Sequence, residues 1–145
     1  MRRPPRAAKG VGRILAVDLG TRRVGLALSD PMRMIASPLR TVPFRGETRL
    51  LEEVLSLVAE RAVDLVLVGL PVREDGREGE GCLRCRRLVE RLAASGVAAE
   101  PWDEQWTSRD AEEVLRSIGK SRKQAVASVD RTAASILLRD YLDSQ

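Results

Sequence analysis

The sequence contains no histidine, and this absence excludes the hydrolases that depend on a Ser-His or Cys-His pair. It has only two cysteines, so the chain cannot supply the four cysteine or histidine ligands of a structural zinc site. Aromatic residues make up 3% of the chain, which is too few for a surface that binds nucleic acid mainly by base stacking. The chemistry that remains is of the kind that carboxylates and a metal ion perform.

Long apolar segments are absent as well. No run of 18 or more apolar residues occurs, so we expect no transmembrane helix and no membrane partner. The first ten residues, MRRPPRAAKG, are not followed by the apolar stretch of a secretory signal, so we expect a cytoplasmic protein. In a reducing cytosol, Cys82 and Cys85 are expected to be ordinary thiols, with an intermolecular disulfide as the alternative.

Size and charge indicate one domain with a basic tail. With 145 residues, 43% of them apolar, we expect a single globular domain at 13–145. The formal net charge of +4 comes from the basic residues of the first ten positions, because acids and bases balance in the rest of the chain. Proline and small residues around them predict a disordered basic tail at 1–12, which is either idle or contacts nucleic acid.

The stretch Arg13–Asp30, RILAVDLGTRRVGLALSD, predicts two strands joined by a tight turn. The apolar run Ile14–Val17 is typical of a strand buried on both faces, and Val24–Ser29 is a second strand pattern. A Gly-Thr pair between them allows the chain to reverse. Asp18 stands where the first strand ends, which suits a bound cation or phosphate; an ordinary turn aspartate is the alternative.

Periodicity and turn residues predict an α/β fold in the order β-β-β-α-β-α-β-α-α, with a five-stranded mixed sheet flanked by helices. The first strand is expected at the centre, and a helical crossover leads from the leading strands to a parallel neighbour. After the hairpin we expect strands at 36–42, 65–68 and 97–102, helices at 47–61, 82–95, 107–118 and 124–142, and a glycine-rich loop at 71–81.

Acidic residues at three places need an explanation. At about 100° per residue, Asp130 falls in the middle of the apolar stripe of the last predicted helix. A carboxylate that points inward needs compensation, so it is either a metal ligand or part of a buried ion pair or cap. After the last strand, only one of Asp103 and Glu104 can face the same way as Asp18, and the alternation does not choose between them. The stripe consists of Val126, Ala133, Ala134, Leu137 and Tyr141.

The ends of the first, fourth and fifth strands are expected along one edge of the sheet, where open α/β sheets hold ligands. Carboxylates that meet there, in a chain without histidine, favour Mg²⁺ or Mn²⁺ over zinc. Such a cluster supports metal-assisted phosphoryl transfer with water as the nucleophile.

Five ordered segments resemble the YqgF/RuvX family: DLGTRRVG, VGLP, WDEQWTS, SRKQAVASVD and DRTAA. Together they extend over more than a hundred residues and are far more specific than any one of them. The resemblance implies an RNase H-like fold and identifies Glu104 as the acidic site residue beside Asp18 and Asp130. It implies a divalent-metal-dependent nuclease, with Mg²⁺ or Mn²⁺ held by these three catalytic residues, that trims the 5′ end of precursor 16S ribosomal RNA in ribosome biogenesis.

Other classes remain as alternatives. The hairpin alone also resembles the actin, hexokinase and sugar-kinase superfamily, but one lobe of this size argues against a fold that closes two lobes over ATP. A Holliday junction resolvase-like DNA endonuclease and a non-catalytic nucleic-acid-binding protein of ribosome assembly stay open. The expected partner is therefore structured RNA or branched DNA, and the protein is expected to be a monomer or a homodimer, since a resolvase needs two sites related by a two-fold axis.

Basic residues around the expected site are candidates for phosphate contacts, because a guanidinium group can bind phosphate through two hydrogen bonds. Two residues depart from the family pattern: Gln105 stands where arginine is usual, and Trp106 where a smaller apolar residue is usual. Another arginine would then have to replace the missing contact. The candidate nucleic-acid-binding residues are Arg22, Arg23, Arg109, Arg122 and Lys123.

Overall fold

The computed structural model of the protein describes residues 12–70, 79–103 and 132–145. The helix expected at 107–118, and most of the expected tail and of the loop at 71–81, lie outside these ranges. No helix of the described ranges is both long and apolar enough to cross a membrane. The elements are β1 (Arg13–Leu19), β2 (Arg23–Ser29), β3 (Ala36–Pro43), α1 (Glu47–Glu60), β4 (Val63–Leu70), α2 (Glu80–Ala94), β5 (Ala99–Asp103) and α5 (Ala133–Asp143).

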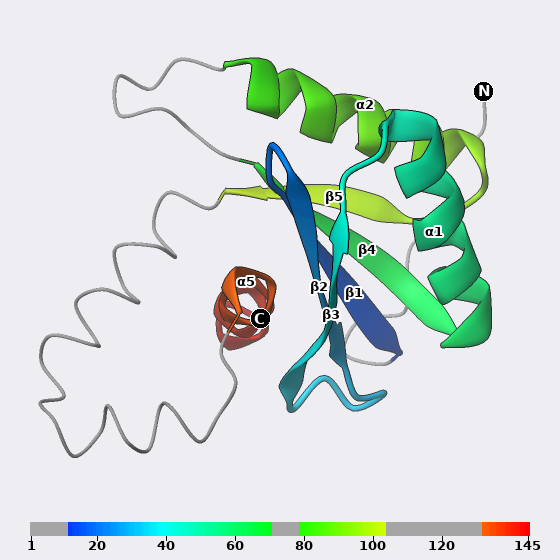
Figure 1. Cartoon of the computed structure of the whole chain (residues 1–145). Coiled ribbons are helices and arrows are strands. Elements are labelled where there is room, and N and C mark those ends of the chain that lie inside the picture. The colour runs from blue at the N-terminus through cyan, green and yellow to red at the C-terminus, as the bar shows by residue number, and fades with distance from the viewer. Residues whose placement is uncertain (1–11, 71–78, 104–131) are drawn as a thin grey trace, which may run out of the picture.

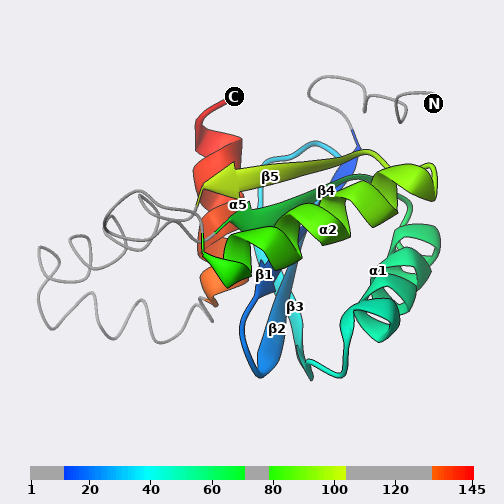
Figure 2. The same ribbon diagram turned by 90° about the horizontal axis from the view of Figure 1, so that it is seen from above.

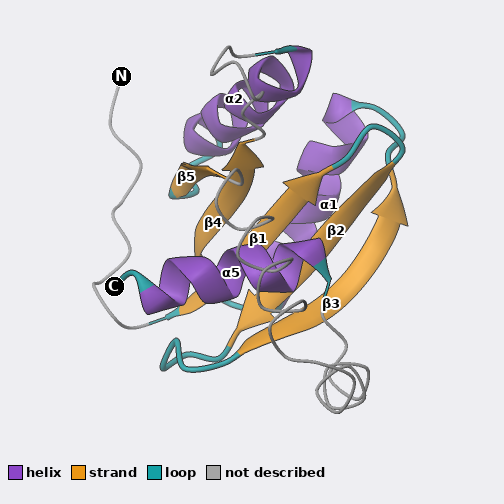
Figure 3. Ribbon diagram, turned by 90° about the vertical axis from the view of Figure 1, so that its left-hand side faces the viewer, coloured by secondary structure: helices purple, strands orange, loops and turns teal. Residues whose placement is uncertain are grey.

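The strands form one mixed sheet in the order β3-β2-β1-β4-β5 (Figure 3). β1 pairs antiparallel with β2 and parallel with β4, and β4 pairs parallel with β5. The predictions of a central first strand and of a parallel neighbour after the first helix are therefore confirmed. β3 forms one edge of the sheet, as Pro38 within this strand indicates.

Helices cover both faces of the sheet: α1 and α2 lie on one side and α5 on the other (Figures 1 and 2). Because successive side chains of a strand point to opposite faces, β1 contributes to two cores. Leu15 and Val17 pack with α1 and α2, whereas Ile14 and Ala16 pack with α5. All four side chains are completely buried, which explains why β1 reads as an uninterrupted apolar run.

The two helices on the first face follow the predicted periodicity. α1 buries Leu50, Val54 and Leu57, and α2 buries Leu88 and Leu92 together with both cysteines. Gly96, at a φ of 84°, terminates α2 as predicted, since few other residues adopt this backbone conformation. Cys82 and Cys85 are both buried thiols on the inner side of α2.

The last helix differs from the prediction, because α5 begins at Ala133 and not near residue 124. Thr132 has an extended backbone and caps the helix: its side chain accepts a hydrogen bond from Ser135 N, and Ser135 Oγ accepts one from Thr132 N. A continuous helix from 124 to 142 is therefore wrong, and Asp130 precedes α5. Ala133 of the predicted stripe is exposed, whereas Ser135 is buried by its capping role.

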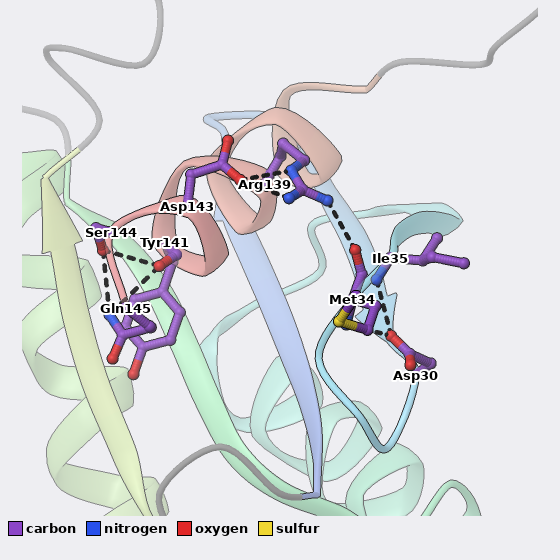
Figure 4. Close-up of polar contacts among 8 residues, drawn as sticks. All are labelled: Asp30, Met34, Ile35, Arg139, Tyr141, Asp143, Ser144 and Gln145. Carbon is purple, nitrogen blue, oxygen red and sulfur yellow. Dashed lines mark hydrogen bonds and ion pairs between the residues drawn. The ribbon is translucent and has the colours of Figure 1, made fainter.

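The connection between β2 and β3 is organised by one carboxylate (Figure 4). Asp30 accepts hydrogen bonds from the backbone N–H groups of Ile35 (2.8 Å), Met34 (2.8 Å) and Met32 (3.2 Å). Arg139 of α5 donates to the carbonyl oxygen of Met34 (2.8 Å), so the loop is also joined to the last helix. These backbone donors, Ile35 first, hold the pKa of Asp30 below its ordinary value.

This lowered pKa predicts a contribution to stability that acid removes. The folded-state pKa lies below the unfolded one, so the contribution is present above about pH 3.9 and is lost as the pH falls through the folded value. The Asp30→Asn variant lacks this pH-dependent contribution to stability, because its side-chain amide does not titrate. We expect the melting temperature of the wild type to fall more steeply than that of the variant between about pH 5 and pH 2.5. Equal slopes in thermal unfolding would contradict this assignment.

Candidate active site at the carboxyl edge of the sheet

Asp18 is partly buried near the end of β1, on the face that α5 covers. Its cross-strand partner is Gly25 of β2. A Cβ atom at Gly25 would lie 3.8 Å from the Cβ of Asp18 and 3.6 Å from the Cβ of Ala134 in the first turn of α5. The absence of a side chain at Gly25 therefore leaves room between the Cβ of Asp18 and the beginning of α5.

The end of β5 shows on which face of the sheet Asp103 lies. Trp102 points toward α5, where its ring meets Tyr141 edge to face at 5.0 Å and its indole N–H donates to Asp140 (3.0 Å). Asp103 follows Trp102 in the strand and pairs with Leu70 of β4. Because side chains alternate, Asp103 lies on the α2 side of the sheet. Asp103 is thus not the acid that faces the same way as Asp18.

The turn between β1 and β2 is tight and basic. The N–H of Gly20 donates to the carbonyl oxygen of Arg23 (2.9 Å), and a Cβ atom at Gly20 would lie only 2.6 Å from that oxygen. This explains why glycine stands here. Arg22 and Arg23 are exposed at the tip, four and five residues after Asp18. Their charges favour an anionic ligand near the carboxyl edge.

The described residues include part of the predicted site. Asp18, Arg22 and Arg23 lie together at one end of the β1–β2 hairpin. Within the described ranges no group of three acidic or thiol side chains is placed to hold a metal ion. Glu104, Asp130, Arg109, Arg122 and Lys123 lie outside the described residues, as do Gln105 and Trp106. Sequence reasoning did not single out Gly25, although its place in the D-x-G-T-x-x-x-G pattern was the signal.

The space at Gly25 predicts a contrast between two substitutions. Gly25→Ala is expected to keep the activity within about twofold of the wild type, because its Cβ makes only ordinary contacts. Gly25→Val is expected to lower it more than about tenfold, since the added methyl groups push Ala134 away from β2. Nuclease assays on both variants measure this, and equal activity of the two would show that the spacing of α5 from Asp18 is unimportant.

Comparisons with known proteins identify the family of the chain. A family model described as "RuvX: Holliday junction resolvase" matches residues 12–144. A protein of Chloroflexus aggregans named "Putative pre-16S rRNA nuclease" is 41% identical over 133 residues, which cover 91% of this chain and 94% of the relative. A protein of the same name from Chlorobaculum tepidum is 39% identical over 136 residues, which cover 91% of this chain and 94% of that protein.

Solved structures support the RNase H-like fold. Thermus thermophilus RuvC matches with a TM-score of 0.56 at 13% identity, over 91% of this chain and 95% of the other. The structure of that protein in complex with a Holliday junction substrate matches with a TM-score of 0.57 at 14% identity, over 92% of this chain and 94% of the other. The family model and the close relatives span nearly all of the sequence, and they show that the chain belongs to the RuvX family.

Proposed function

We propose that the protein is a divalent-metal-dependent nuclease that hydrolyses phosphodiester bonds at the 5′ end of precursor 16S ribosomal RNA. Its family and the names of its relatives support a nuclease acting on this RNA. The observation that carries the metal-dependent chemistry is the position of Asp18. Asp18 lies near the carboxyl edge of the sheet, opposite Gly25 and beside the beginning of α5.

The two other predicted acids lie close in the sequence to residues on the Asp18 face of the sheet. Glu104 directly follows Asp103, and if the alternation of β5 continues by one residue, Glu104 takes the face of Trp102, which is also that of Asp18. Asp130 precedes Thr132 by two residues, which limits the distance between their Cα atoms to about 7.6 Å. These relations support a convergence of three carboxylates.

The chemistry of Asp18 fits a divalent cation. Its carboxylate is partly buried, and among the described residues none donates a hydrogen bond to it or forms an ion pair with it. A partly buried carboxylate without a protein partner is available to a hard cation, which prefers oxygen ligands. Asp18, Glu104 and Asp130 would hold Mg²⁺ or Mn²⁺, which, when bound, supplies a polarised water and neutralises charge at the phosphate. Arg22 and Arg23 would bind and orient the phosphate backbone.

A Holliday junction resolvase is the second candidate, and the description of the family model favours it. A resolvase must cut two strands symmetrically and therefore acts as a dimer with two sites. The same carboxylates would serve either substrate. The two candidates differ in the nucleic acid and in the oligomeric state that activity requires.

Cleavage of precursor 16S ribosomal RNA and of a four-way DNA junction, side by side with and without Mn²⁺, tests the proposal. We expect Mn²⁺-dependent cleavage near the 5′ end of the RNA and much slower cleavage of the junction. Faster cleavage of the junction by a dimer, established by solution mass measurement, would favour the resolvase. Binding of both nucleic acids without cleavage of either would contradict both candidates and indicate a non-catalytic assembly protein.

A further inference from the structure

Arg84 of α2 reaches across to the turn that follows Asp18. Its guanidinium donates to the carbonyl oxygen of Gly20 (3.3 Å). The same group lies over the ring of Phe44, with its central carbon 4.3 Å from the ring centroid. Arg84 is partly buried, and an arginine stacked on an aromatic ring in a partly dry environment has little freedom to reorient.

Phe44 is itself joined to the same turn. It directly follows β3, and its N–H donates to the carbonyl oxygen of Arg22 (2.8 Å). The turn is therefore held at Gly20 by a side chain and at Arg22 by a backbone group, and Arg84 links the two supports. Three segments that are distant in the sequence meet here: the β1–β2 turn, the residue after β3, and the first turns of α2.

We infer that Arg84 is a positioning residue for the candidate active site. It fixes the turn that leaves Asp18 and carries Arg22 and Arg23, so it sets the direction of the carboxylate and of the two phosphate-binding side chains. The inference rests on the proposed function. A shell of residues that orients metal ligands commonly changes metal affinity or activity by about 10- to 100-fold when it is removed.

Arg87 provides a matched control on the same helix. It lies three residues after Arg84 and bonds Glu47 of α1 at 2.7 Å, on the exposed surface between the two helices. Arg87→Ala removes one arginine and one surface contact from α2 and leaves the contacts of the β1–β2 turn in place. Exposed pairs of this kind contribute little to stability, because water and salt screen their charges.

The experiment measures Mn²⁺ binding by calorimetry, with the metal alone, and amide hydrogen exchange at Gly20 and Phe44. We expect Arg84→Ala to weaken Mn²⁺ binding about tenfold and to speed exchange at both amides. Arg87→Ala is expected to leave both within about twofold of the wild type. In cleavage assays the Arg84 variant should lose kcat more than it raises KM. If the alanine variant does not fold, Arg84→Gln, which keeps a donor but loses the charge, replaces it.

Two failures can be told apart with Asp18→Asn as a reference. If the wild type binds Mn²⁺ and Asp18→Asn does not, but Arg84→Ala binds like the wild type, the positioning role is overturned and the proposed function stands. If the wild type and Asp18→Asn bind Mn²⁺ equally, the metal site of the proposed function is overturned, and the role of Arg84 with it. Unchanged exchange at Gly20 and Phe44 in Arg84→Ala also overturns the inference.

Discussion

Replacing Asp18 by asparagine is expected to lower the cleavage rate about a hundredfold or more and to leave the fold intact. Under the proposed function it removes a direct metal ligand, and such a loss exceeds that of a residue that only orients a ligand. The amide keeps the shape of the side chain but loses its charge and one of its strong acceptor oxygens. Because the carboxylate has no partner among the described residues, its removal breaks no contact there. Initial rates with Mn²⁺ on precursor 16S ribosomal RNA measure the effect.

Asp103→Asn is the matched control for this prediction. It removes one carboxylate from the same edge of the sheet, but from the face that α2 covers. We expect its cleavage rate to stay within about twofold of the wild type, because its exposed side chain lies on the face opposite to that of Asp18. Thermal unfolding of both variants checks that they are folded. Undiminished cutting by Asp18→Asn would remove Asp18 from the active site.

Leu137→Ala is expected to have the largest effect on stability, about 2–5 kcal/mol of unfolding free energy. The side chain is 1% exposed and packs in the core between α5 and the sheet, with Ile14 and Ala16 of β1. Truncation of Leu137 leaves a cavity beneath α5, the helix that covers the face of the sheet on which Asp18 lies. We also expect a loss of cleavage activity, because α5 holds Ala134 against the space beside Asp18.

Urea unfolding measures the stability change, and Leu83→Ala is its control. Leu83 is a leucine of α2 with 52% of its surface exposed, so its truncation should change the unfolding free energy by less than about 0.5 kcal/mol. Equal unfolding midpoints of the two variants would show that α5 does not contribute a well-packed core.

The local sequence pattern was sufficient to predict most strands and helices of the described residues. The run Ile14–Val17 is apolar without alternation because both faces of β1 are covered, and this feature is visible in the sequence itself. The end of α2 is also determined by a nearby residue, because Gly96 adopts a conformation that glycine favours. The place of Asp18 followed from the same reasoning, since a strand end and a turn are both local features.

Other features depend on contacts that periodicity does not contain. The helical spacing of apolar residues continues through Thr132, so the pattern alone does not reveal that Thr132 is the N-cap at which α5 begins. The face of Asp103 is set by the packing of Trp102 on Tyr141, 39 positions later in the chain. Arg84 meets Gly20 and Phe44 only through the tertiary fold, and its place in a charged helix gives no sign of this role.

A crystal structure of the protein grown with Mn²⁺, with anomalous scattering data, tests the central claim most directly. We predict an anomalous peak about 2.0–2.2 Å from a carboxylate oxygen of Asp18, the usual distance for a hard divalent ion of this size. Oxygens of Glu104 and Asp130 should complete the site, and the peak should vanish in Asp18→Asn crystals. A folded protein in which Glu104 or Asp130 pairs with an arginine away from Asp18, with no peak at Asp18, would contradict the account.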